Sequence, residues 1–62
     1  MRDPNRIYPF LNTLAQGWLQ KPDLRFGQLI EILKNYSGRH DLFYVEDEDM
    51  LQIIKEYFDL DE

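Results

Sequence analysis

Four consecutive acidic residues, Glu46 to Asp49, form the densest set of possible metal ligands in the sequence. Carboxylate oxygens are the ligands that divalent cations such as Ca²⁺ prefer. The calcium loop pattern, however, needs oxygens at alternate positions around a glycine and then a bidentate Glu, and this segment contains no glycine. Acidic residues also stabilise the first turn of a helix, because their negative charge is attracted to the partial positive charge at the helix N-terminus. We therefore predict a helix start with a solvated acidic turn and no metal site.

A second candidate for chemistry is the pair His40 and Asp41, in which a carboxylate could orient an imidazole. Ser37, the only serine, lies three residues earlier, and the chain has no cysteine. Neither a serine motif nor a cysteine is therefore present to act as an activated nucleophile. A serine at a helix end is typical of a local cap. We predict no enzymatic activity, no catalytic residue and no cofactor.

The second predicted helix presents residue types that can contact bases or phosphates. If residues 20–23 form the turn of a helix-turn-helix, this helix would be the one that reads the groove. Glu31 interrupts the polar face, and the formal net charge of −5 opposes attraction to phosphates. Weak nucleic-acid binding is therefore the alternative function, and its candidate residues are Arg25, Gln28, Lys34 and Asn35.

The elements that would position these residues are three amphipathic helices, predicted over 3–20, 23–36 and 47–58 from apolar residues that recur every three or four positions. Asp3 followed by Pro4 signals the first start. Pro9 either kinks that helix or marks its true beginning. The sequence predicts an all-α fold, a single small three-helix domain over residues 1–62, with a short extended linker before the third helix.

Specific predictions can be made for two glycines and for the linker before the third helix. Gly27 lies inside the second predicted helix, where glycine costs about 1 kcal/mol relative to alanine unless another helix packs closely, and Trp18 is the candidate neighbour. Gly38, after Ser37, signals a left-handed helix end. Residues 42–45 are expected to carry aromatic anchors across the helix pair. The predicted core is Ile7, Phe10, Leu11, Leu14, Trp18, Leu29, Ile30, Leu33, Leu51, Ile54 and Phe58.

Nine large aromatic rings are more than a three-helix core of this length encloses easily. The alternatives are a ring-rich core with the tyrosine hydroxyls in water, or a surface that binds protein, where Tyr and Trp are enriched. The chain is short and has no disulfide or zinc ligands to stabilise it, which favours association. We predict a protein–protein interaction module, either a homodimer or an adaptor, with a surface formed by Tyr36, Phe43, Tyr44 and Tyr57.

Charge is segregated along the chain. Residues 1–40 hold six basic and three acidic residues, a net charge of +3, whereas residues 41–62 hold one basic and nine acidic residues, a net charge of −8. Either the two parts fold against each other, or the acidic part meets a basic partner. In a homodimer the +3 part of one copy could also approach the −8 part of the other, an attraction that salt would weaken.

The distribution of apolar residues along the chain bears on where the protein is located in the cell. No apolar run approaches the roughly 18 residues of a membrane span, and residues 1–5 show no signal-peptide pattern. A hydrophobic content of 44% is typical of a folded chain rather than a disordered acidic segment. We expect a cytoplasmic protein that makes no contact with membranes.

Three blocks of sequence carry a resemblance: RDPxRI from Arg2, PDLRFGQLI from Pro22 and FYxED from Phe43. With them the chain resembles a group of short bacterial and phage-borne proteins of no known function, from Arg2 to about Leu51. The resemblance implies a small stand-alone protein of a bacterium or its phage. It implies no activity, cofactor or site residue.

Overall fold

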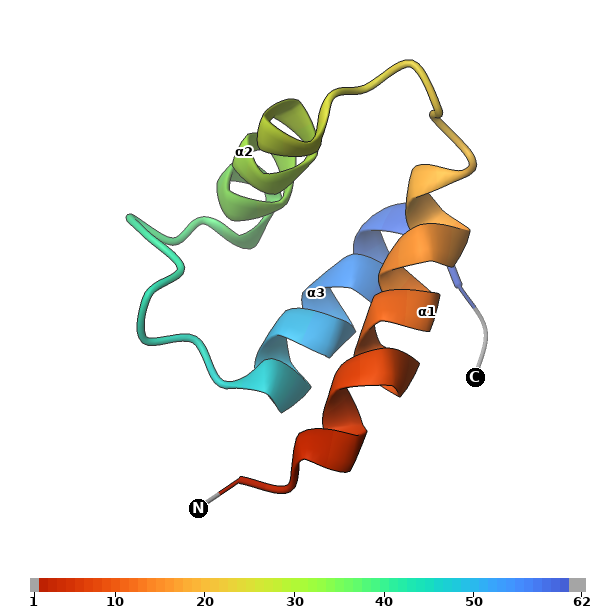
Figure 1. The fold of residues 1–62 in the computed structure, drawn as a ribbon. Coiled ribbons are helices and arrows are strands. Elements are labelled where there is room, and N and C mark those ends of the chain that lie inside the picture. Colours follow the sequence, from red (N-terminus) through yellow and green to blue (C-terminus); the bar gives the residue numbers. More distant parts are fainter. Residues whose placement is uncertain (1, 61–62) are drawn as a thin grey trace.

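The computed structural model describes residues 2–60. Within that range it contains one 3₁₀ turn, η1 (Pro4–Arg6), and three α-helices, α1 (Ile7–Trp18), α2 (Phe26–Ser37) and α3 (Asp47–Phe58), and no strand. The predicted all-α, three-helix class is confirmed. Figure 1 shows α1 and α3 side by side, with α2 set against α3 at the end of two long connections. None of the helices in this range has the length and apolar character needed to cross a bilayer.

The first helical segment begins as its local signals predict. The Asp3 side chain accepts a hydrogen bond from the backbone N–H of Asn5 at 2.9 Å, and Pro4 is the first residue of η1. Pro9 is the third residue of α1, a position where a helical N–H has no partner within the helix. The second alternative for Pro9 therefore holds, since α1 begins two residues before it. The predicted helix over 3–20 is too long, because its first turn is 3₁₀ and α1 ends at Trp18.

The second helix begins three residues later than predicted. Its first turn is capped by Gln28, whose side-chain oxygen accepts from the Arg25 N–H at 2.8 Å. Gly27 is thus the second residue of α2, exposed, with nothing within 4 Å of where a Cβ would stand. Close helix packing does not explain it. Trp18 packs instead on the ring of Phe26, at 5.7 Å between centroids.

The ends of α2 and α3 both use left-handed residues. Gly38 has φ +74° after α2, as its position next to Ser37 predicts. The predicted third helix, 47–58, matches α3 at both ends, and its first turn is acidic as expected. Asp59 then turns left-handed with φ +56°, and the Leu60 N–H donates to the Lys55 carbonyl at 2.9 Å. That bond closes α3 and brings Leu60 against the core.

Helices α1 and α3 run in the same direction and are joined near both ends. At their beginnings Arg6 forms an ion pair of 2.5 Å with Asp47. At their far ends the Gln20 side-chain amide donates to the carbonyl of Phe58 at 3.1 Å. Between them Gly17 is buried against Phe58, so closely that a Cβ on Gly17 would lie 2.8 Å from two atoms of the ring. The close packing expected at Gly27 therefore occurs at Gly17.

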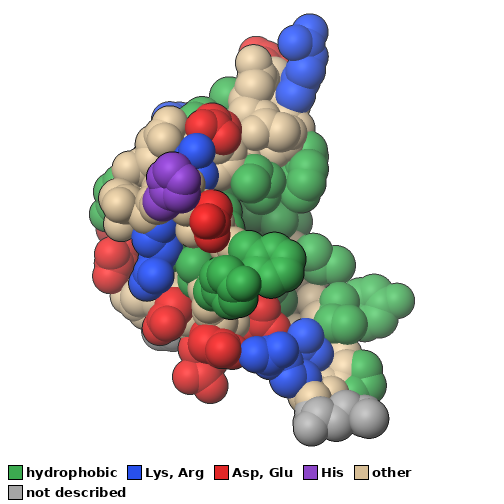
Figure 2. Space-filling model, turned by 90° about the vertical axis from the view of Figure 1, so that its left-hand side faces the viewer, with side chains coloured by type: hydrophobic (Ala, Val, Ile, Leu, Met, Phe, Trp, Pro, Cys, Tyr) green, Lys and Arg blue, Asp and Glu red, His purple; other side chains and the backbone are tan. Residues whose placement is uncertain are grey.

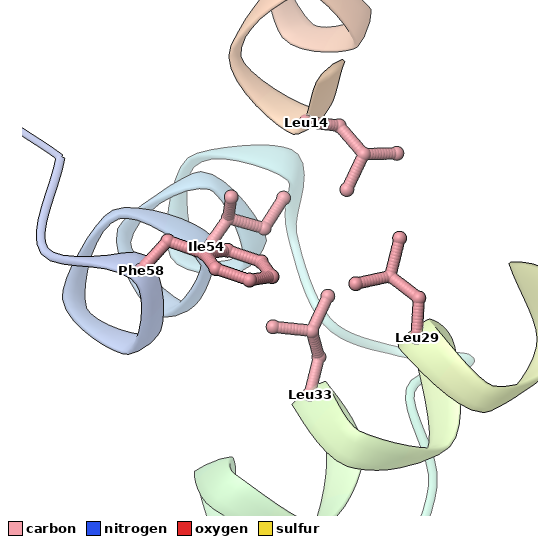
Figure 3. Close-up of a cluster of buried hydrophobic side chains, with 5 residues drawn as sticks. All are labelled: Leu14, Leu29, Leu33, Ile54 and Phe58. Carbon is pink, nitrogen blue, oxygen red and sulfur yellow. The ribbon is translucent and has the colours of Figure 1, made fainter. Parts of the chain in front are cut away.

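Five buried side chains, drawn from all three helices, form the core. Figure 3 shows them pointing toward one another from α1, α2 and α3: Leu14, Leu29, Leu33, Ile54 and Phe58. All five belong to the predicted core. Ile7 and Leu11 were also predicted to be buried, which is wrong, because they are 45% and 47% exposed. Phe10, Trp18, Ile30 and Leu51 are half-buried. Helix α2 packs on α3 and leaves much of α1 uncovered (Figure 1), so Ile7 and Leu11 on α1 remain in contact with solvent.

Candidate interaction surface

An open apolar groove of about 420 Å³ lies where α2 diverges from α1. The buried side chains Leu14, Leu33 and Ile54 reach it from the core. Around them stand partly or largely exposed residues from every helix and from the linker before α3: Phe10, Leu11, Phe26, Ile30, Leu42, Phe43, Val45, Asp47 and Met50. We call this feature the groove. Its floor is formed by side chains of the same buried cluster that makes up the core.

The linker before α3 supplies two projecting rings at the groove. Phe43 and Tyr44 are 83% and 86% exposed and touch edge to face, at 4.8 Å between ring centroids. They are the middle residues of a turn that the Val45 N–H closes by donating to the Leu42 carbonyl at 3.2 Å. Leu42 and Val45 are half-buried, so aliphatic side chains anchor the linker. The expectation that the rings anchor it is wrong, because the turn directs its middle residues outward.

The four rings predicted as an interaction surface divide into two pairs. Tyr36 and Tyr57 touch each other at 5.3 Å between centroids, and the Tyr57 hydroxyl accepts from the Lys21 ammonium at 3.3 Å. Tyr57 lies in the last turn of α3, about 15 Å along the helix axis from its start at a rise of about 1.5 Å per residue. Phe43 and Tyr44 lie beside that start, where they share a surface hollow with Glu46. Of the four rings only Phe43 lines the groove, and Tyr44 lies beside it in contact with the Phe43 ring.

Figure 2 shows the face that includes this linker, with hydrophobic side chains gathered over it and acidic and basic side chains meeting at its lower end. The charged contacts there join the two halves of the sequence. Arg2 pairs with Glu46 at 2.6 Å, and the hydrogen bond and charge of that carboxylate raise the pKa of the Arg2 guanidinium. Together with the pair of Arg6 and Asp47, this supports the interpretation that the basic and acidic parts fold against each other.

The residues of the nucleic-acid alternative are partly engaged in local contacts. Gln28 caps α2, and Lys34 forms an ion pair of 2.9 Å with Glu31 on the same helix. Arg25 and Asn35 are exposed near opposite ends of α2. The connection between α1 and α2 spans residues 19–25, longer than the three or four residues of a helix-turn-helix turn. Of this set Arg25, Gln28 and Asn35 are exposed, and Lys34 is half-buried.

Ser37 and Asp41, which were considered as possible catalytic residues, form hydrogen bonds with nearby backbone groups. The Ser37 hydroxyl donates to the Lys34 carbonyl at 2.6 Å and accepts from the Arg39 N–H at 3.2 Å, as a helix-end cap does. The Asp41 carboxylate accepts from the Phe43 N–H at 3.1 Å, which shapes the linker turn. Over residues 2–60, no group of three or more His, Asp or Glu side chains is arranged to hold a metal ion.

Sequence reasoning missed the groove because it assigned half of the groove's residues to a closed core. One signal pointed to it. The apolar stripe of the second helix is unusually wide and includes Phe26, Leu29, Ile30 and Leu33, which indicates contact on more than one side. In the structure Leu29 and Leu33 face the core, and Phe26 and Ile30 line the groove.

Comparisons of this chain with protein-family models, with curated proteins and with solved structures gave no match.

Proposed function

We propose that this protein is an interaction module whose partner is a second copy of itself. The observation that carries the proposal is exposed surface. The chain leaves 5033 Å² accessible to solvent. A folded monomeric protein of 7.6 kDa exposes about 4,300 Å² by the usual scaling with mass. The difference is close to the roughly 800 Å² that each partner contributes to a standard interface.

The shape of the chain and the type of its exposed residues support the same proposal. The Cα radius of gyration is 11.5 Å, against about 10.6 Å for a compact domain of this length. Among the described residues, eight large hydrophobic side chains are exposed, and five of them are aromatic. Single exposed apolar residues are normal on a protein surface, but three of these eight, Leu11, Phe26 and Phe43, line one apolar groove, which is typical of a site of association.

Charge works against association, and the structure changes how salt should act on it. Each copy carries a net charge of −5, so two copies repel each other. The sequence alone suggested an attraction between the basic part of one copy and the acidic part of the other. Arg2 and Arg6 are already paired within the chain, so that attraction is weakened. Added salt should therefore strengthen the dimer by screening the repulsion.

The test is sedimentation equilibrium of the full chain from low micromolar to near-millimolar concentration, at low and at high salt. We expect a reversible monomer–dimer equilibrium and a melting temperature that rises with concentration, because dimerisation stabilises the folded state by mass action. A monomer at every concentration, with a constant melting temperature, would overturn the homodimer. A foreign protein would then be the candidate partner.

A further inference from the structure

We infer that the two copies exchange aromatic side chains, so that Phe43 and Tyr44 of each copy enter the groove of the other. This inference rests on the proposed function and deepens it by naming the contact. A twofold symmetric interface must be self-complementary, since the same patch lies on both sides. Here one patch contains both a projection, the two rings, and a hollow, the groove. In a twofold dimer each copy would therefore offer its two rings to the hollow of the other.

The areas agree with this arrangement. A large aromatic side chain buries about 150–250 Å² when it is enclosed. Two rings per copy, together with the groove walls that they cover, approach the surface that each copy exposes beyond the expected value for its mass. Phe43 and Tyr44 are also the two most exposed large hydrophobic side chains among the described residues. Removing them from water is the largest apolar gain that any pair of neighbouring residues on this surface offers.

The polar surroundings of the two rings permit a close approach. The charged residues beside them at the start of α3, Glu46 and Asp47, are already paired with Arg2 and Arg6. Two backbone N–H groups of the linker, those of Phe43 and Val45, already donate hydrogen bonds within the turn, so they need no partner from a second copy. Two copies can therefore meet at this face without burying an isolated carboxylate, which would be costly.

The first experiment compares Phe43→Asp with Leu19→Asp by sedimentation equilibrium. Both residues are highly exposed, but Leu19 lies in a different apolar hollow, with Ala15, Trp18 and Pro22. We expect Phe43→Asp to raise the dimer dissociation constant by at least about 30-fold, as removal of a hot spot does. Leu19→Asp should change it less than about threefold. The melting temperatures of dilute, monomeric samples check that both variants remain folded.

The second experiment locates the contact by cross-linking, which is clean because the chain contains no cysteine. Phe43→Cys chains are mixed with Leu11→Cys chains at near-millimolar concentration, where the dimer still forms although one of its rings has been removed. A disulfide between positions 43 and 11 then forms only between copies. Mild oxidation should give this cross-link in much higher yield than a mixture of Phe43→Cys with Leu19→Cys.

The outcomes separate the two proposals. A wild-type chain that never dimerises overturns both of them. If the wild-type chain dimerises and the Phe43→Asp chain dimerises equally well, the exchange of rings is overturned and the homodimer stands. The same conclusion follows if Phe43→Cys cross-links to Leu19→Cys in place of Leu11→Cys. Loss of the dimer in Phe43→Asp together with the cross-link between positions 43 and 11 supports both.

Discussion

Helix α1 borders α3 on one side and α2 on the other, and the two boundaries differ. One is closely packed and the other is open to solvent, although apolar residues face both. Toward α3 it forms a closed seam, with Gly17 in direct contact with the ring of Phe58 and polar bonds near both ends. Toward α2 it borders the open groove, where its Phe10 and Leu11 remain partly or largely exposed. A residue without a side chain allows the first pair of helices to approach. Large side chains meet on the other boundary, and α2 is joined to α1 through Trp18 and Phe26 at one end.

This contrast has a physical basis in packing. A closed seam excludes water and fills space to the density of a protein interior, so any change of volume there is felt. A groove that is open to solvent can accommodate a change of volume, because its neighbours are water and mobile side chains. Substitutions of similar chemistry on the two boundaries should therefore differ in their effect on the free energy of unfolding.

The largest expected effect separates the core from the groove wall. Leu33→Ala removes a fully buried side chain and should lower the free energy of unfolding by about 2–5 kcal/mol. Leu11→Ala removes a side chain that is 47% exposed and should cost less than about 1.5 kcal/mol in dilute solution. Urea denaturation measures both. Equal losses in the two variants would mean that the groove is closed in solution.

The next effect tests the closed seam itself. Gly17→Leu places a side chain where the ring of Phe58 already lies, and overpacking of this kind typically costs about 1–3 kcal/mol or more. The larger helix propensity of leucine opposes this loss by less than about 1 kcal/mol. Chemical denaturation should show a net destabilisation. A Gly17→Leu variant as stable as the wild type would contradict the close approach of α1 and α3.

Gly27 provides the matched control, with the opposite sign. It is exposed, and a Cβ there would meet no atom within 4 Å. Gly27→Ala should therefore raise the free energy of unfolding by up to about 1 kcal/mol through helix propensity. The same denaturation series measures it beside Gly17→Ala. If both glycines responded with the same sign, the difference between the two boundaries would lose its main support.

The smallest effect concerns the ion pair at the start of the seam. Arg6 and Asp47 are both substantially exposed, with 41% and 48% of their side-chain surface accessible. Exposed pairs contribute about 0.2–1 kcal/mol. A double-mutant cycle with Arg6→Gln and Asp47→Asn should give a coupling energy in that range, which falls as salt is raised. A coupling of zero at low salt would show that packing alone sets the register of α1 and α3.

The candidate site was only partly predictable. The sequence indicated that some rings remain at the surface, and Phe43 and Tyr44 do so. It could not indicate that Tyr36 and Tyr57 pair with each other far from that linker, since residue spacing says nothing about the angle at which α2 crosses α3. The groove was missed for the same reason. Phe10, Leu11 and Ile30 have the spacing of core residues, and only the position of α2 leaves them uncovered.

The three helices and several of their ends could be predicted from the sequence, because the signals for them act over a few residues. These signals act on backbone groups that are close to them in the chain. They are Asp3 with Pro4, Ser37 with Gly38, and the acidic first turn at Asp47. Which glycine allows close helix packing depends instead on the arrangement of the helices. Gly17 and Gly27 both lie within helices, and only the path of α3 brings the Phe58 ring against one of them and leaves the other in water. Contacts across 41 residues of chain depend on how whole helices pack, which no local pattern records.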